Sequence, residues 1–161
     1  MTSKERVLER ERQRGRAAAL EVQEISPNLT GTELNAVDDR IPAFKAACEK
    51  KNMLERAAGD KTGFVCRSTA GRVVRLLQKY DSTTYVHDDG TPWEPEELPA
   101  LWRFVWSTDP AKARPFISLS TSPYAKGDCC LNAAGVAKRS TLNGANTWSP
   151  DTNPEFWEDA V

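Results

Sequence analysis

Hydrophobic residues are sparse over the first segment of the chain, residues 1–25. Val7, Leu8 and Leu20 are separated by runs of charged and small side chains, and their spacing does not form the continuous seam of a coiled coil. The pattern predicts a helix over residues 3–22 that buries little of its own surface. We therefore expect a charged helical arm that is disordered alone and ordered by a partner.

Short helical patterns follow over residues 26–60. Thr30 and Glu33 have the spacing of a capping box, in which each side chain binds the backbone N–H of the other residue. They predict a short helix over 33–40. Residues 43–58 are rich in alanine, with larger apolar side chains at roughly helical spacing, and predict a second helix. We expect this region to consist of short helices.

The period of the pattern changes after residue 60. Residues 63–68 and 72–78 carry alternating apolar and polar side chains around a turn at Gly71, which predicts a β-hairpin. Residues 128–131 and 136–141 repeat the arrangement with fewer apolar side chains. Each hairpin is followed by a polar loop and by a segment rich in Trp and Pro, which we expect to close over it as a short strand or irregular cover.

The two hairpins belong to a duplicated sequence pattern. The shared positions are Cys66, Gly71, Arg75, Trp93, Pro95, Pro99 and Trp102 in the first copy and Cys130, Gly135, Arg139, Trp148, Pro150, Pro154 and Trp157 in the second. Offsets within the Cys–Gly–Arg group and within the Trp–Pro group are identical, and the first copy has one insertion between the two groups. Repeats of this size are usually small modules that bind or assemble.

Large apolar side chains are needed to stabilise such small modules, because an isolated hairpin is marginally stable. Each Trp can bury roughly 150–250 Å², so Trp93 and Trp102 are expected to be structural lids on the first hairpin. Trp148 and Trp157 would cover the second hairpin in the same way. The alternative for an exposed Trp is a platform on which a sugar stacks.

These patterns together predict an α+β fold: a helical N-terminal half followed by two small tandem antiparallel β modules, each a hairpin with a Trp-Pro lid. The expected units are the arm at 1–25, the short helices at 26–60, the first module at 61–106, and the linker with the second module at 107–161. A unit of about 40 residues is at the lower limit of independent stability, so we expect the modules to pack on each other, on the N-terminal half or on other subunits.

Charge is distributed unevenly. The net charge is −1, yet residues 1–16 carry six basic and three acidic side chains. The arginines of this segment are Arg6, Arg10, Arg12, Arg14 and Arg16. One interpretation is a solvated helix with ion pairs at i,i+3 spacing; the other is an arm that docks on an acidic partner surface. The near-zero net charge predicts no nucleic-acid partner.

The four cysteines are expected to be buried free thiols. The N-terminal segment lacks the apolar region of a signal peptide, and no apolar stretch is long enough to span a membrane, so we expect synthesis in the cytoplasm and no disulfides. Cys129 and Cys130 are adjacent and should face opposite sides of a strand. With His87 as the only histidine, the sequence predicts no metal and no cofactor.

Carboxylates cluster around the first Trp-Pro segment without forming a recognisable catalytic motif. The cluster consists of Asp81, Asp88, Asp89, Glu94, Glu96 and Glu97. Paired carboxylates can hydrolyse a glycoside, but such residues also occur in solvated loops. No phosphate-binding loop and no G-x-S-x-G motif is present. We therefore expect no enzyme activity.

The second copy resembles the small carbohydrate-binding modules of families 5 and 12, the chitin-binding type. The matching residues are Phe116, Pro123-Tyr124, Gly127-Asp128, Gly135, Trp148-Ser149-Pro150 and Trp157. Residues 40–161 also resemble phage and prophage tail proteins of Gram-positive bacteria that carry such modules. This second likeness rests on Gly71–Gln78, on Glu96–Trp102 and on the Trp-Ser-Thr-Asp-Pro sequence at 106–110.

The resemblance implies a structural virion protein of the tail, baseplate or fibre, with other subunits as partners, homo-oligomerisation, and assembly in the host cytoplasm. The alternative is an accessory module that recognises a cell-surface glycan through Phe116, Tyr124, Trp148 and Trp157. In the sugar-binding family the hairpin supplies an exposed Tyr, but Val74 and Lys138 stand there in the two copies. The scaffold is thus better retained than the platform, which favours subunit docking.

Overall fold

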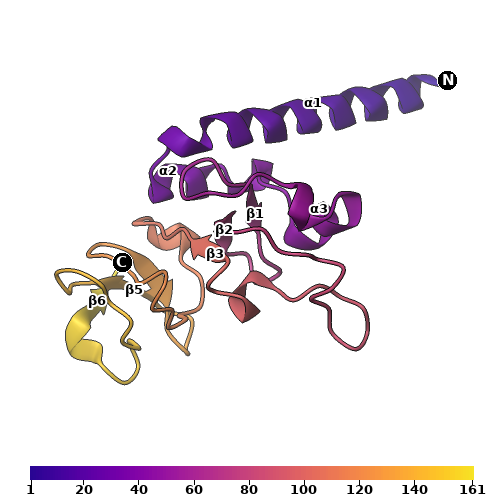
Figure 1. The fold of residues 1–161 in the computed structure, drawn as a ribbon. Coiled ribbons are helices and arrows are strands. Elements are labelled where there is room, and N and C mark those ends of the chain that lie inside the picture. The colour runs from indigo at the N-terminus through magenta and orange to yellow at the C-terminus, as the bar shows by residue number, and fades with distance from the viewer.

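The computed structural model describes residues 1–161 and has a long helix beside two small antiparallel sheets (Figure 1). The helices are α1 (Ser3–Ile25), α2 (Gly31–Ala36) and α3 (Phe44–Lys50). The first sheet contains β1 (Val65–Arg67), β2 (Val73–Leu76) and β3 (Trp102–Phe104); the second contains β4 (Cys129–Leu131), β5 (Ala137–Ser140) and β6 (Trp157–Asp159). The expected α+β class is confirmed.

Helix α1 is longer than predicted, and its C-terminal end packs on the body. Thr2 and Glu5 form a capping box at its start, and it ends before the turn Ser26–Asn28. Val22 is 1% exposed and belongs to an apolar cluster that also contains Val65. The expectation that a partner alone orders the arm is therefore wrong for this end. The helix is not apolar enough to cross a membrane, and neither is any other.

A side-chain amide joins α1 to the first sheet. The Gln23 Nε2 donates to the Val65 carbonyl at 2.7 Å, and the Val65 N–H donates to the Gln23 Oε1 at 3.0 Å. One primary amide thus satisfies both backbone groups of an edge-strand residue, as a neighbouring strand would. This contact and Val22 position the whole helix on the body.

The short helices begin within two residues of the predicted positions, at Gly31 and Phe44, but are brief. The capping box of Thr30 and Glu33 is formed, and α2 ends after six residues, followed by a turn at Asp38–Arg40. Helix α3 also covers less of the predicted span. The Asn52 side chain accepts the Leu54 N–H and starts a separate turn, which breaks the predicted 43–58 helix.

The central strand of the first sheet, β2, is buried on both faces. Strand β2 lies in the centre, with Cys66 opposite Val74 and Leu76 opposite Trp102. Val74 and Trp102 join the main core together with Phe44, whereas Val73 faces the cluster beneath α1. The sheet is thus a layer between α1 on one side and the main core on the other.

The second sheet repeats this register. Strand β5 is central, with Cys130 opposite Lys138 and Ser140 opposite Trp157. The turns of the two hairpins contain Gly71 at φ +85° and Gly135 at φ +79°, a left-handed conformation that glycine adopts without strain. The duplicated sequence pattern therefore corresponds to two units of the same strand order and pairing.

The repeated unit begins earlier than the predicted boundary at residue 61. A parallel bridge joins Ala43 to Arg67 in the first unit, and an equivalent bridge joins Pro115 to Leu131 in the second. Phe44, which follows the first bridge, is fully buried in the core of its sheet. The segment around α3 therefore belongs to the first module.

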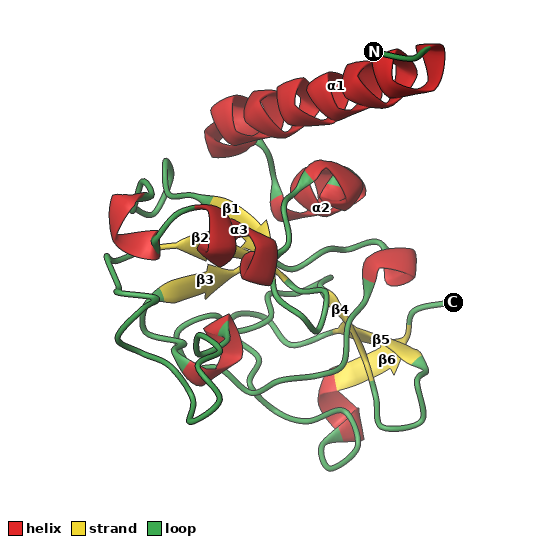
Figure 2. Cartoon of the chain, turned by 90° about the vertical axis from the view of Figure 1, so that its right-hand side faces the viewer, coloured by secondary structure: helices red, strands yellow, loops and turns green.

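The two modules lie side by side and share an aromatic contact (Figure 2). Trp106 stacks on Phe104 at 5.8 Å and on Tyr124 at 4.2 Å between ring centroids. Its indole Nε1 donates to the Ser122 carbonyl at 2.9 Å. Trp106 therefore links the end of the first sheet to the core of the second module.

Candidate docking and ligand-binding surfaces

Only one Trp of each pair is a buried lid. Trp102 is fully buried against Phe44 and Tyr80, at 5.8 and 6.0 Å between ring centroids. Trp157 is 7% exposed, and its Nε1 donates to a backbone carbonyl at 2.8 Å. Trp93 is 37% exposed, so the expectation that it acts as a structural lid is wrong.

The expected glycan face is not a continuous surface. Tyr124 is 1% exposed, because Trp106 and Phe116 stack on its two sides and the edge of Trp157 contacts its ring. These rings form the core of the second module, so Tyr124 and Trp157 cannot serve as sugar platforms. Trp148 alone is well exposed, at 51%.

A second exposed aromatic group lies on the insertion of the first module. Residues 85–93 form a tight hairpin, in which the Trp93 N–H donates to the Tyr85 carbonyl at 3.0 Å and the His87 N–H donates to the Thr91 carbonyl at 2.9 Å. Tyr85 is 47% exposed, and the His87 and Trp93 rings stack at 5.9 Å. We call residues 85–93 the acidic hairpin, because Asp88 and Asp89 lie exposed at its tip.

The carboxylates around this hairpin are mostly held in local hydrogen bonds. Glu96 accepts from Arg72 at 3.1 Å, and Glu97 accepts from the His87 Nε2 at 2.9 Å when that nitrogen carries the proton. Hydrogen bonds from Asn52 and then from neighbouring threonines hold the pKa of Asp81 well below its usual value. These groups stabilise loop geometry, and Asp88 remains without a side-chain partner.

The predicted arm arginines are all exposed along α1. Two of them make the expected i,i+3 pairs: Arg12 with Glu9 at 3.9 Å and Arg14 with Glu11 at 2.8 Å. Arg6 and Arg10 make no ion pair. Val7 and Leu8 are 56% and 47% exposed on the same stretch, so this end of the helix carries both free cations and uncovered apolar side chains.

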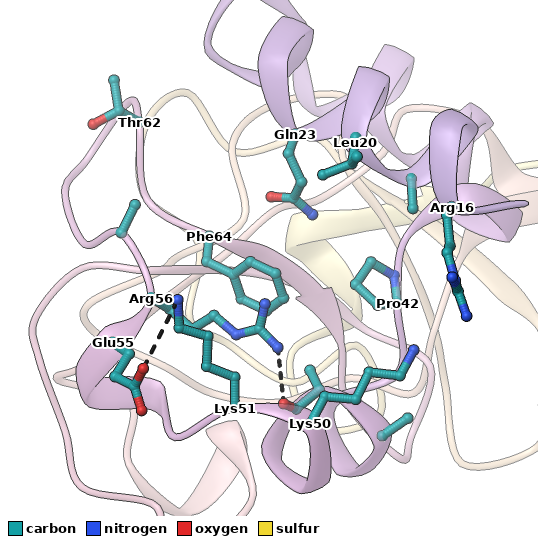
Figure 3. Close-up of a pocket in the computed structure, with 14 residues that line it drawn as sticks. Arg16, Leu20, Gln23, Pro42, Lys50, Lys51, Glu55, Arg56, Thr62 and Phe64 are labelled. Carbon is teal, nitrogen blue, oxygen red and sulfur yellow. Dashed lines mark hydrogen bonds and ion pairs between the residues drawn. The ribbon is translucent and has the colours of Figure 1, made fainter. Parts of the chain in front are cut away.

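Arg16 instead lines a groove of about 700 Å³ between α1 and α3 (Figure 3). The groove has an apolar floor that includes Pro42, Ala47 and Phe64. Its other lining cations are Lys50, Lys51 and Arg56, and its one acidic residue is Glu55. We call this feature the basic groove.

Arg56 lies in the middle of the basic groove. Its guanidinium lies 4.4 Å from the centre of the Phe64 ring, and its Nη2 donates to the Ala47 carbonyl at 2.9 Å. No carboxylate pairs with it. A cation that is held by a ring face and one carbonyl keeps donors available for an anionic ligand.

Two buried arginines were not anticipated from the sequence. Arg75 is 7% exposed, and its guanidinium donates to the carbonyls of Ser26 and Gly63. Desolvation lowers its pKa. Arg72 is 8% exposed and bonds Glu96 and the Pro115 carbonyl, which ties the first module to the second. The sequence held a signal for Arg75 alone: an arginine stands at this offset in both copies of the repeat, which places Arg75 on the central strand.

The cysteines are free thiols. Cys129 and Cys130 face different clusters, as expected for adjacent strand residues. Burial raises the pKa of Cys130 to about 12 and raises that of the half-buried Cys48. No group of three or more His, Cys, Asp or Glu side chains is placed to hold a metal ion.

Comparisons with protein-family models, with curated proteins and with solved structures found no match. The features available to support a function are therefore the exposed arm, the basic groove, the acidic hairpin and the isolated Trp148.

Proposed function

We propose that this chain is a non-enzymatic structural component of a phage or phage-tail-like particle, associated with its tail, baseplate or fibre. In this proposal the helical arm docks on another subunit, and the two β modules are the scaffold that carries the arm. The particle itself is suggested by the resemblance of residues 40–161 to tail proteins. The docking role is suggested by the geometry of α1.

One observation carries the docking role. Helix α1 contacts the body near its C-terminal end, through Val22 and Gln23, while Val7 and Leu8 remain largely exposed. Its N-terminus is the part of the helix farthest from the sheets (Figure 1). A polar helix of this kind is marginal in water without a partner, and exposed apolar side chains among free arginines suit a protein surface with apolar and acidic groups.

The test is incorporation into particles made in the producing host. A tagged chain that lacks residues 2–14 keeps Arg16, Val22 and Gln23, so the body and the basic groove stay intact. We expect this chain to fold and to be absent from purified particles. Val7→Gln with Leu8→Gln should show the same defect, whereas Ala17→Gln, on another face of α1, should incorporate normally. Normal incorporation of the truncated chain would reject the arm as the attachment point.

Recognition of a cell-surface glycan is the second candidate. The observation that favours it is Trp148, which is 51% exposed and packs against Phe156 at 6.0 Å between ring centroids. An exposed indole that is held by a second ring can stack on a sugar face. Retention of the wild type on insoluble cell-wall polysaccharide, lost in Trp148→Ala and kept in Trp93→Ala, would favour this role over docking.

A further inference from the structure

The basic groove between α1 and α3 contains cations that no group of the chain neutralises. Arg16, Lys50 and Arg56 line it, and none of the three makes an ion pair. Figure 3 shows the Arg16 and Lys50 side chains directed toward each other at one end of the groove. Cations that converge without a carboxylate repel one another, and an anion between them would relieve that repulsion.

The floor of the groove selects the kind of anion. Pro42, Ala47 and Phe64 give it apolar surface beneath the basic rim. A small inorganic anion would contact the rim and leave this floor exposed to water. A ligand with acidic groups next to aromatic or aliphatic side chains would contact both the basic rim and the apolar floor, and the burial of apolar surface would add to the charge attraction.

The same chain presents a segment with this chemistry. The acidic hairpin has Asp88 and Asp89 at its tip and the exposed rings of Tyr85 and Trp93 at its base. Asp88 has no side-chain partner, while the Asp89 carboxylate accepts from the Thr91 hydroxyl at 2.6 Å. The tip of the hairpin is acidic, and the groove is basic.

The hairpin is also preorganised for binding. The backbone bonds at its base and a bridge between Val86 and Pro92 fix its two sides. Gly90 supplies the left-handed turn residue, at φ +85°. Little conformational entropy would be lost on docking, so charge and apolar contacts translate more fully into affinity.

We infer that the basic groove binds the acidic hairpin of a second copy of this chain. The inference rests on the proposed assembly role, for which it names one partner. The hairpin and the groove lie on different faces of α3: Gly90 and Pro92 line a small cavity with Lys45 and Cys48, whereas Ala46, Ala47 and Lys50 line the groove. One copy therefore presents its hairpin while it receives another copy's hairpin in its groove, and this head-to-tail contact closes into a ring or continues as a chain.

The test measures self-association of the full chain by sedimentation equilibrium. The groove variant is Lys50→Glu with Arg16→Glu, and the hairpin variant is Asp88→Lys with Asp89→Lys. Each should weaken self-association at least tenfold, and the four changes combined should restore it to within about tenfold of the wild type. Matched reversals at the exposed Lys126→Glu and Glu158→Lys in the second module should leave self-association unchanged. Circular dichroism checks that every variant is folded.

Two further measurements sharpen the result. Association should weaken as salt rises from about 0.1 M to about 1 M, because exposed ion pairs are screened. Trp93→Ala should weaken association, whereas Trp148→Ala, at the matching position of the other module, should not. A wild type that stays monomeric, self-association that is indifferent to both reversals, or a combined variant that stays dissociated would each overturn the inference.

These outcomes are separate from those of the incorporation test. A monomeric wild type whose incorporation depends on residues 2–14 would reject only the self-association. Self-association with the expected charge-swap behaviour, together with normal incorporation of the truncated chain, would reject only the proposed docking role of the arm.

Discussion

Replacement of Trp102 by alanine should be among the most damaging single changes in the first module. Its indole is fully buried and contacts Phe44 and Tyr80 edge-on. Large-to-small changes at such sites cost about 3–5 kcal/mol, from lost apolar transfer and from the remaining cavity. With a urea m-value of about 2 kcal/mol/M, the unfolding midpoint should fall by roughly 1.5–2.5 M.

The repeat provides an internal control. Trp148 is 51% exposed, so truncating it leaves no closed cavity, and Trp148→Ala should cost only about 1 kcal/mol. Trp102→Phe should recover more than half of the loss, because it keeps a ring in the core and removes an indole N–H that has no hydrogen-bond partner. Unfolding followed by far-UV circular dichroism gives all three values. Equal destabilisation by Trp102→Ala and Trp148→Ala would refute the assignment of one buried lid per module.

The remaining predictions concern thiols, acid and sugar. Cys48 should react with Ellman-type reagent before any other thiol. Its rate should rise about tenfold per pH unit through pH 9, because burial raises the pKa of Cys48 above the usual value of a thiol. Cys130 should react only on unfolding, and Cys48→Ser should abolish the early phase. Hydrogen bonds lower the pKa of Asp81 in the folded state, so its contribution to stability is present above pH 4 and is lost as pH falls. Asp81→Asn should lower the free energy of unfolding at pH 7 and make that free energy fall less steeply with acid. An acid dependence identical to that of the wild type would contradict this. Tyr124→Phe should leave polysaccharide retention as in the wild type, since the residue is 1% exposed. Loss of retention with an intact fold would contradict the burial of Tyr124.

Much of the fold was accessible from the sequence, because it depends on local patterns. The capping box of Thr30 and Glu33, the hairpin around Gly71 and the repeat spacing each specify a conformation through nearby residues. The break after α3 was missed, because the Asn52 cap competes with an alanine-rich helical pattern. The start of the first module was predicted too late, because the repeated positions begin at Cys66 and the bridge at Ala43 has no sequence signature.

The candidate surfaces were harder to predict, because exposure depends on tertiary packing. The sequence treats Trp93 and Trp102 alike, yet one lies beside the exposed ring of His87 and the other lies in the main core. Tyr124 is one of the residues that carry the resemblance to sugar-binding modules, but Trp106 at the end of the first module stacks on its ring. The basic groove joins Arg16 to residues that are distant in sequence, so no local pattern marks it.

The central claim is that the N-terminal part of α1 is a docking element that its own body leaves uncovered. Amide hydrogen exchange of residues 3–15, measured on the isolated chain and on purified particles, tests this claim most directly. We expect fast exchange in the isolated chain, because Val7 and Leu8 are largely exposed, and strong protection in the particle. Exchange that is equally fast in both states would contradict the claim.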